Sequence, residues 1–151
     1  MEENSLTPAM EDYIETIYLL EEKNKVARVS EIGRSMKVRK ASVVSAVSNL
    51  QKQNMIEHEK YGFITLTPFG RETAEKIYKK HKIILEFLES ILKVEPERAL
   101  EEACGIEHAL SAGTVDKLSV FVKQFKTAPE KNETKNRKTK KNADTKKKTF
   151  K

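Results

Sequence analysis

Residues 27–67 read ARVSEIGRSMKVRKASVVSAVSNLQKQNMIEHEKYGFITLT, and this stretch decides the fold. A short helix is predicted to begin at a Ser30 cap and to end near Met36. The polar segment KVRK, residues 37–40, then leads into a second helix over about 41–53. A helix, a tight turn and a helix are typical of a DNA-binding helix-turn-helix, although an ordinary helical hairpin has the same pattern.

The second of these helices has one apolar face and one polar face. Val43, Val47 and Leu50 recur at helical spacing and are expected in the core. The outward positions carry short polar groups and a cation: Ser42, Ser45, Ser48, Asn49 and Lys52. Because such groups can approach bases and phosphates in a major groove, we predict base contacts by Ser42, Ser45 and Asn49 and phosphate contacts by Arg39, Lys40 and Lys60. Val44 fits a thymine methyl or the core equally well.

A β-hairpin is predicted directly after the second helix. The segment MIEHEKYGFITLT gives two short strands around Tyr61-Gly62, with apolar residues alternating in the second strand. The order of elements is therefore that of a winged helix-turn-helix. Lys60 and Tyr61 would lie in the wing, over the DNA backbone or a minor groove, and His58 is interpreted as structural or surface-exposed.

An earlier helix is expected to begin at the Thr7 cap, with Pro8 in its first turn. Its apolar stripe consists of Met10, Ile14 and Ile17. Asp12 and Glu15 fall on roughly the opposite face. Two carboxylates in this position are ordinarily solvated.

The remainder of the folded chain reads as helical. Thr67-Pro68 opens a helix of about 25 residues with an apolar seam, to which the sequence contributes Ile77, Ile84, Leu85, Leu88 and Leu92. A seam this apolar needs cover, and a second copy of the chain is the simplest partner, so a homodimer is predicted. Pro96 starts another helix. Ser111 is expected to cap the last one, with an apolar stripe of Val115, Leu118, Val122 and Phe125.

The segment EEACGIEHALS, residues 101–111, contains the chain's one cysteine. Cys104, Glu107 and His108 stand at i, i+3 and i+4, so they share a helix face. A thiolate, a carboxylate and an imidazole are good ligands for first-row metals. Two other interpretations stay open: a buried cysteine beside a surface Glu–His pair, and a cysteine nucleophile with His108 as its base.

Length and charge narrow the class of protein. The 151 residues suit one compact unit or two small ones, and a single cysteine fits the reducing cytoplasm. The acidic N-terminus resembles no secretory signal, and no apolar run spans a membrane.

The net charge of +6 comes from residues 126–151, which hold 11 Lys/Arg and 3 Asp/Glu. This segment is predicted to be disordered, as a solubilising tail or as an arm that attracts phosphate.

Several of these motifs together resemble the diphtheria toxin repressor family. They are MEDYIETIYLLEE, ARVSEIGRSMKV, EKYGFITLTPFGRE, KKHKIILEFL and GIEHALS, in matching order over about residues 5–125. The resemblance implies a metal-activated transcriptional repressor of iron or manganese homeostasis. The length is similar to that of the short manganese transport regulators, which lack the SH3-like third domain of the longer iron repressors.

The resemblance also implies a set of metal ligands: Asp12, Glu15, His81, Cys104, Glu107 and His108. We expect a principal site of Asp12, Cys104, Glu107 and His108 and a weaker site of Glu15 and His81 that shares Glu107. Two ancillary ligand positions of the iron repressors are Leu85 and Leu100, so that ancillary site is expected to be absent. The thiolate favours Fe²⁺, with Mn²⁺ a close second, and makes a two-metal cluster doubtful.

The predicted fold is mainly α with a small β-hairpin wing. Residues 1–66 form the winged helix-turn-helix DNA-binding domain, residues 67–126 an all-helical metal-binding and dimerisation domain, and residues 127–151 a disordered basic tail. The predicted function is a cytoplasmic, metal-activated repressor that binds a pseudo-palindromic DNA operator as a homodimer and is not an enzyme. The alternatives are a metal-independent winged-helix repressor and a metal or thiol hydrolase.

Overall fold

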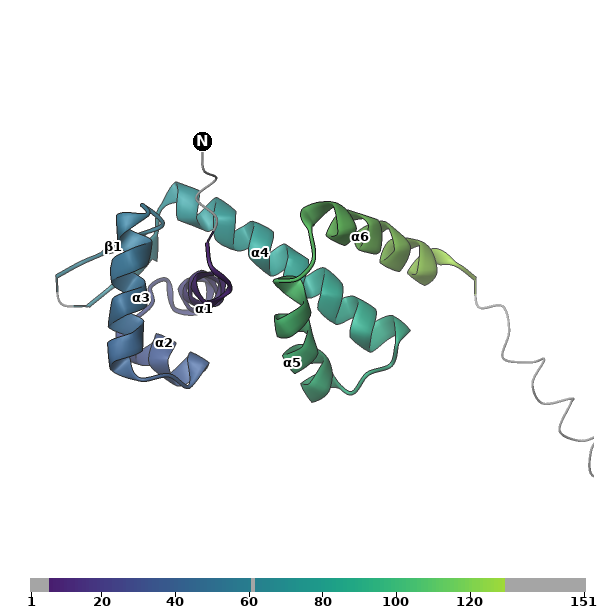
Figure 1. Ribbon diagram of the computed structural model, residues 1–151, viewed down its shortest axis with the longest axis horizontal. Helices are drawn as coiled ribbons and strands as arrows, with labels where there is room; N and C mark the ends of the chain where they lie inside the picture. Colours follow the sequence, from purple (N-terminus) through teal and green to yellow (C-terminus); the bar gives the residue numbers. More distant parts are fainter. Residues whose placement is uncertain (1–5, 61, 130–151) are drawn as a thin grey trace, which may run out of the picture.

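The computed structural model describes residues 6–60 and 62–129, which form two helical halves joined by one long helix (Figure 1). In chain order the elements are α1 Pro8–Asn24, α2 Val29–Met36, α3 Lys40–Lys52, β1 Ile56–His58, β2 Ile64–Leu66, α4 Pro68–Glu86, the π-helical turn η1 Phe87–Ile91, α5 Pro96–Glu107 and α6 Ala112–Thr127. Within the described ranges, no helix is long and apolar enough to cross a membrane. The mainly α fold with a hairpin wing is confirmed.

The core of the first half lies between α1, α2, α3 and the hairpin. Its fully buried side chains include Ile14, Ile17, Ile32 and Leu50, which come from all three helices. Since each helix contributes one apolar stripe, the opposite face of α3 stays exposed to solvent. The helix-turn-helix is thereby held as one packed unit.

The predicted start of α2 is two residues too late. The helix begins at Val29, and Arg28 is its N-cap, without a side-chain capping bond. The backbone of Arg28 is extended, and its carbonyl accepts the amides of Glu31 and Ile32. Ser30 therefore lies inside the first turn. The side-chain caps expected at Thr7 and Ser111 are present, and Thr67 caps α4 in the same way.

The hairpin is short and is anchored to the helices. β1 and β2 pair antiparallel, with Ile56 opposite Leu66 and His58 opposite Ile64, and Ala27 forms an isolated bridge to Ile64. His58 is exposed, in line with the surface interpretation. Tyr61, expected in the wing, lies outside the described residues.

Helix α4 runs through both halves, and its start is fixed against the first half. Thr67 caps it by accepting the amide of Gly70 and donates its hydroxyl to the carbonyls of Asn54 and Met55. A Cβ on Gly70 would lie 1.8 Å from the Met55 carbonyl oxygen, so only glycine permits this close approach. The predicted long helix thus exists, and its last turn, η1, is π-helical.

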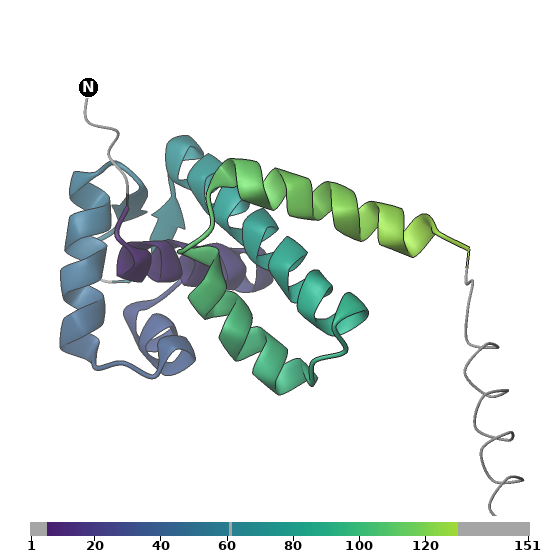
Figure 2. The same ribbon diagram turned by 45° about the vertical axis from the view of Figure 1, so that its right-hand side comes forward.

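Helices α5 and α6 pack on either side of the second part of α4 (Figure 2). Ile84, Leu88, Ala99 and Ala103 form the small core here. Several apolar side chains of this half are exposed instead, among them Leu92, Leu100, Val120, Phe121 and Phe125. Leu92 of the predicted seam and Phe125 of the last apolar stripe are thus not covered by this chain itself. Helix α6 ends at Thr127, and residues 130–151 of the predicted tail lie outside the described residues.

Candidate metal centre

Three helices bring acidic and imidazole side chains together where the two halves meet. Helix α1 contributes Glu11, Asp12 and Glu15, α4 contributes His81, and the end of α5 contributes Glu107 with His108 as its C-cap. Five of the six predicted ligands therefore belong to one cluster. They form two groups of side chains that could each hold one metal ion: Asp12, Glu107 and His108, and Glu15, His81 and Glu107.

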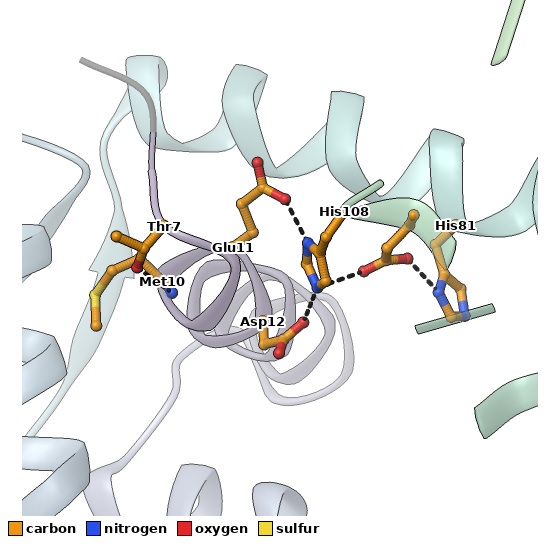
Figure 3. A network of polar contacts seen from close by, with 7 residues as sticks. Thr7, Met10, Glu11, Asp12, His81 and His108 are labelled. Carbon is orange, nitrogen blue, oxygen red and sulfur yellow. Dashed lines mark hydrogen bonds and ion pairs between the residues drawn. The ribbon is translucent and has the colours of Figure 1, made fainter. Parts of the chain in front are cut away.

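The first group is centred on the imidazole of His108 (Figure 3). Its Nε2 lies 2.9 Å from Oδ1 of Asp12 and 3.6 Å from Oε1 of Glu107. Its Nδ1 lies 2.8 Å from Oε2 of Glu11. The ring is thus surrounded by three carboxylates, two of which come from α1.

The second group is more deeply buried. Nδ1 of His81 lies 2.6 Å from Oε2 of Glu107, and their side chains are 8% and 1% exposed. Glu15 is only 9% exposed and faces the same pair. The ordinary expectation of a solvated Glu15 is therefore wrong, because α1 turns this face toward α4 and α5. Glu107 belongs to both groups and lies between the two imidazoles.

Burial changes the protonation of this cluster. Burial and the nearby Glu107 carboxylate raise the pKa of Glu15 from 4.5 to about 7. The hydrogen bond to Glu107 raises the pKa of His81. Burial opposes the charged form of His108, but the hydrogen bonds that its ring donates to Glu11 and Asp12 outweigh this effect and raise the pKa of His108. The cluster is thus an acidic pocket that favours bound positive charge.

A divalent cation fits this arrangement. Oε1 of Glu107 is buried and has no hydrogen-bond partner in the part of the chain that the structure describes. An unpaired buried carboxylate oxygen is costly unless a cation or proton neutralises it. The two groups together offer three carboxylates and two imidazoles, which are ligands that Mn²⁺, Fe²⁺ and Zn²⁺ accept.

Cys104 is the predicted ligand that the structure leaves outside. It is exposed on α5 and belongs to neither group. The alternative of a buried cysteine beside a surface Glu–His pair is also wrong, because Glu107 is the buried member. Cys104 as a whole is exposed, but its thiol is partly buried. This burial raises the pKa of the thiol to about 11, and the nearby carboxylates of Glu107, Glu15 and Asp12 act in the same direction. A thiol with so high a pKa is a poor nucleophile at neutral pH.

The ancillary positions Leu85 and Leu100 hold no ligand atoms. Leu85 packs against the second core, and Leu100 is 51% exposed on α5.

Glu11 is the member of the cluster that the sequence does not predict. It precedes Asp12 by one residue, and an acidic residue in the first turn of a helix is common. No spacing rule in the sequence links it to His108, which follows 97 positions later. Only the packing of α1 against the end of α5 brings the two together.

A second surface of interest is the outward face of α3 with the wing. All six predicted DNA-contacting residues are exposed: Arg39, Lys40, Ser42, Ser45, Asn49 and Lys60. Val44 is 50% exposed on the same helix, so the core interpretation for it is wrong. Residues 27–60 hold seven Lys/Arg and three Asp/Glu, which gives this region a net positive charge.

Two family models match consecutive parts of the chain. Residues 5–63 match the DNA-binding domain at the N-terminus of iron dependent repressors, and residues 67–135 match the metal-binding and dimerisation domain of the same family. The boundary between the two matches falls near the start of α4.

Relatives of similar sequence point to the same family as these two models. An HTH-type transcriptional regulator MntR of Bacillus pumilus is 37% identical over 124 residues, which are 82% of this chain and 85% of the relative. The MntR of Oceanobacillus iheyensis is 40% identical over 120 residues, 80% of this chain and 81% of that one. The relatives are transcriptional regulators, and none of these names describes an enzyme.

Solved structures share the fold. The crystal structure of T. acidophilum IdeR is 29% identical with a TM-score of 0.69, covering 82% of this chain and 56% of that one. The manganese regulator SloR is 30% identical with a TM-score of 0.69, covering 78% of this chain and 55% of SloR. The match thus spans about half the length of these two solved proteins. The chain belongs to the iron dependent repressor family of metal-dependent transcriptional regulators, and it has the family's DNA-binding domain and metal-binding and dimerisation domain.

Proposed function

We propose that this protein is a repressor whose DNA binding is switched on by a divalent metal held between its two halves. One observation carries the proposal: His108, at the end of α5, contacts two carboxylates of α1 at 2.8 and 2.9 Å. Helix α1 packs in the DNA-binding half, whereas α5 packs in the other half. A site built from both halves is sensitive to the angle between them.

The proposed ligands are Asp12, Glu107 and His108 for one ion and Glu15, His81 and the shared Glu107 for a second. A bound cation supplies the positive charge that lets these carboxylates ionise side by side. The protein's own residues then hold α1 against α4 and α5. This contact fixes the orientation of α3. The expected coupling free energy between metal binding and DNA binding is about 1–3 kcal/mol.

The position of Cys104 removes the main argument for Fe²⁺ as the activating metal. The prediction of Fe²⁺ rests on a thiolate ligand, and Cys104 lies outside both groups. Carboxylates and imidazoles without a thiolate suit Mn²⁺ as well as Fe²⁺. The description of the similar protein SloR as a manganese regulator favours Mn²⁺. We therefore propose Mn²⁺ as the activating metal, with Fe²⁺ as the competing ion.

For the DNA we propose that α3 enters a major groove. Ser42, Ser45 and Asn49 would read base edges. Arg39, Lys40 and the wing residue Lys60 would contact phosphates. Val44 would meet a thymine methyl, since an exposed apolar side chain among short polar ones suits that contact.

The assembly proposed is a homodimer on a pseudo-palindromic operator, with each α3 in one half-site. The exposed apolar side chains of the second half, including Leu100 and Phe121, support an interface there. We propose a DNA-binding domain over 1–66, a dimerisation domain over 67–126 and a basic tail over 127–151. As a DNA-binding regulator, the protein would act in the cytoplasm.

The test measures binding of the full chain to labelled genomic fragments, including its own promoter, by fluorescence anisotropy at fixed salt. Chelator is compared with Mn²⁺, Zn²⁺ and, anaerobically, Fe²⁺. We expect specific binding only with metal, at the lowest free concentration for Mn²⁺. Glu107→Ala should lose the response, while Glu101→Ala, an exposed α5 residue, should keep it.

Specific binding that persists unchanged in chelator would contradict the proposal. It would favour a metal-independent winged-helix repressor, in which the Glu107 cluster is only part of the packing between the halves.

A further inference from the structure

Glu11 is the member of the cluster that the proposed ligand groups do not use. It lies in the first turn of α1 and is 28% exposed. It also lines a cavity of about 320 Å³ that reaches Glu107 and is bordered by Lys76, Lys80 and Val115. Glu11 is thus near the metal centre without belonging to either group of candidate ligands.

The two nitrogens of His108 face different partners. Nδ1 faces Glu11, at 2.8 Å from Oε2. Nε2 faces Asp12 at 2.9 Å and Glu107 at 3.6 Å. The ring is therefore oriented with one edge toward Glu11 and the other toward the first ligand group (Figure 3).

This orientation matters because a neutral imidazole carries one proton. A metal can bind only the nitrogen that has a free lone pair, and the partner of the other nitrogen decides which tautomer forms. A carboxylate at Nδ1 accepts the Nδ1–H. Nε2 then faces Asp12 and Glu107 and is the nitrogen that would exchange its proton for a cation.

His108 depends on this contact because of its place in the chain. It caps the C-terminus of α5, so it lies at the end of that helix rather than within it. Asp12 holds the same ring through Nε2, but Asp12 is itself a proposed ligand. Once Asp12 and Nε2 both turn to a cation, the contact with Glu11 is what still fixes the ring.

We propose that Glu11 is a positioning residue of the metal centre: its carboxylate accepts Nδ1–H of His108 and keeps Nε2 directed at Asp12 and Glu107, where a cation would take the place of the Nε2 proton. This inference rests on the proposed function, because it concerns the same site. It assigns to Glu11 no contact with the ion.

The first readout is the nitrogen of His108 that binds the metal, measured from ¹⁵N chemical shifts of the full chain with Zn²⁺, which is diamagnetic. The chain has three histidines, and His58→Gln assigns the exposed one. We expect metal at Nε2 and a proton at Nδ1 in the wild type and in the Glu101→Gln control. In Glu11→Ala a population with metal at Nδ1, or exchange-broadened ring resonances, should appear.

The second readout is metal affinity by calorimetry with Mn²⁺. Glu11→Ala should weaken binding by about 10–100-fold without changing the number of ions bound. Glu11→Gln keeps an oxygen acceptor for Nδ1–H, so its affinity should lie between those of wild type and Glu11→Ala. Thermal unfolding of each variant separates this effect from a loss of folding.

Two outcomes would overturn the inference. One is a Glu11→Ala protein with the wild-type metal-binding nitrogen and affinity, which would make Glu11 a surface acid beside His108. The other is loss of one bound ion per chain in Glu11→Ala, which would make Glu11 a ligand. If the wild type binds no metal but Glu11→Ala still shifts or broadens the His108 ring resonances, the proposed function fails and the positioning contact stands.

Discussion

At the scale of single residues, Glu15 shows how burial converts a surface-type residue into part of a site. Its pKa is raised to about 7 by burial and by Glu107. A carboxyl with a raised pKa stabilises the fold only while protonated, so this contribution is present below pH 4.5 and is lost as the pH rises through about 7.

Glu15→Gln should therefore stabilise the metal-free protein at pH 8 relative to wild type and should have less effect at pH 4.5. The amide replaces the carboxyl without acquiring charge. Thermal unfolding across this pH range measures the difference, with Glu101→Gln as the control. A difference that does not depend on pH would contradict the raised pKa.

Cys104 should react slowly despite its exposure. With a pKa of about 11, only on the order of one thiol in a thousand is thiolate at pH 8. Alkylation by iodoacetamide should be slower than that of free cysteine and should accelerate with pH. Cys104→Ser should keep the affinity for Mn²⁺. A large loss of affinity would mean that Cys104 joins the site when metal binds, and the preference for Fe²⁺ would regain its basis.

At the scale of elements, the start of α4 depends on Gly70. Because a Cβ there would lie 1.8 Å from the Met55 carbonyl oxygen, Gly70→Ala forces the backbone apart. We expect a loss of about 1–3 kcal/mol or more in the free energy of unfolding. Gly113→Ala in α6, where a Cβ meets nothing within 4 Å, is the matched control and should be neutral or stabilising. Equal effects in urea unfolding would argue against the close approach.

On the exposed face of α3, substitutions should distinguish contacts to phosphates from contacts to bases. Lys40→Ala or Lys60→Ala should weaken binding to all sequences and reduce the salt slope by about 1. Ser45→Ala or Asn49→Ala should change preference at one position, with a cost of about 1–3 kcal/mol. Binding of an operator and its single-base variants at several salt concentrations tests this. Lys117→Ala, exposed on α6, is the control. A uniform loss from the Asn49 variant would reassign Asn49 to the backbone.

At the scale of the whole molecule, the metal centre joins two cores. The first core comprises α1 to α3 with the hairpin, and the second lies between the end of α4, α5 and α6. Helix α4 is the covalent connection between them. Contacts from α1 to the end of α5 add a second connection, which binding of a cation would tighten.

Saturating Mn²⁺ should therefore raise the melting temperature of the whole chain. At free metal about 100 times Kd the gain is about 2.7 kcal/mol, or a rise of roughly 5–10 °C. Glu107→Ala removes the residue shared by both groups and should abolish this rise, whereas Glu101→Ala should retain it. Differential scanning calorimetry with and without metal measures it. A full rise in Glu107→Ala would place the metal elsewhere.

The sequence by itself determined the order of elements. Val43, Val47 and Leu50 at helical spacing defined the buried face of α3, and Thr67-Pro68 marked the start of α4. These features depend on local periodicity and capping, which are properties of neighbouring residues. The start of α2 was misplaced, because Arg28 caps through its backbone and leaves no side-chain signature.

Only the tertiary structure decided which of the candidate ligands meet. Cys104, Glu107 and His108 share a helix face in the sequence, yet α5 buries Glu107 and leaves Cys104 exposed. Glu11 meets His108 across 97 positions. The physical reason is that helical spacing sets the direction of a side chain only relative to its own helix. How α1 and α5 approach each other is set by the two cores and by α4, which no local pattern encodes.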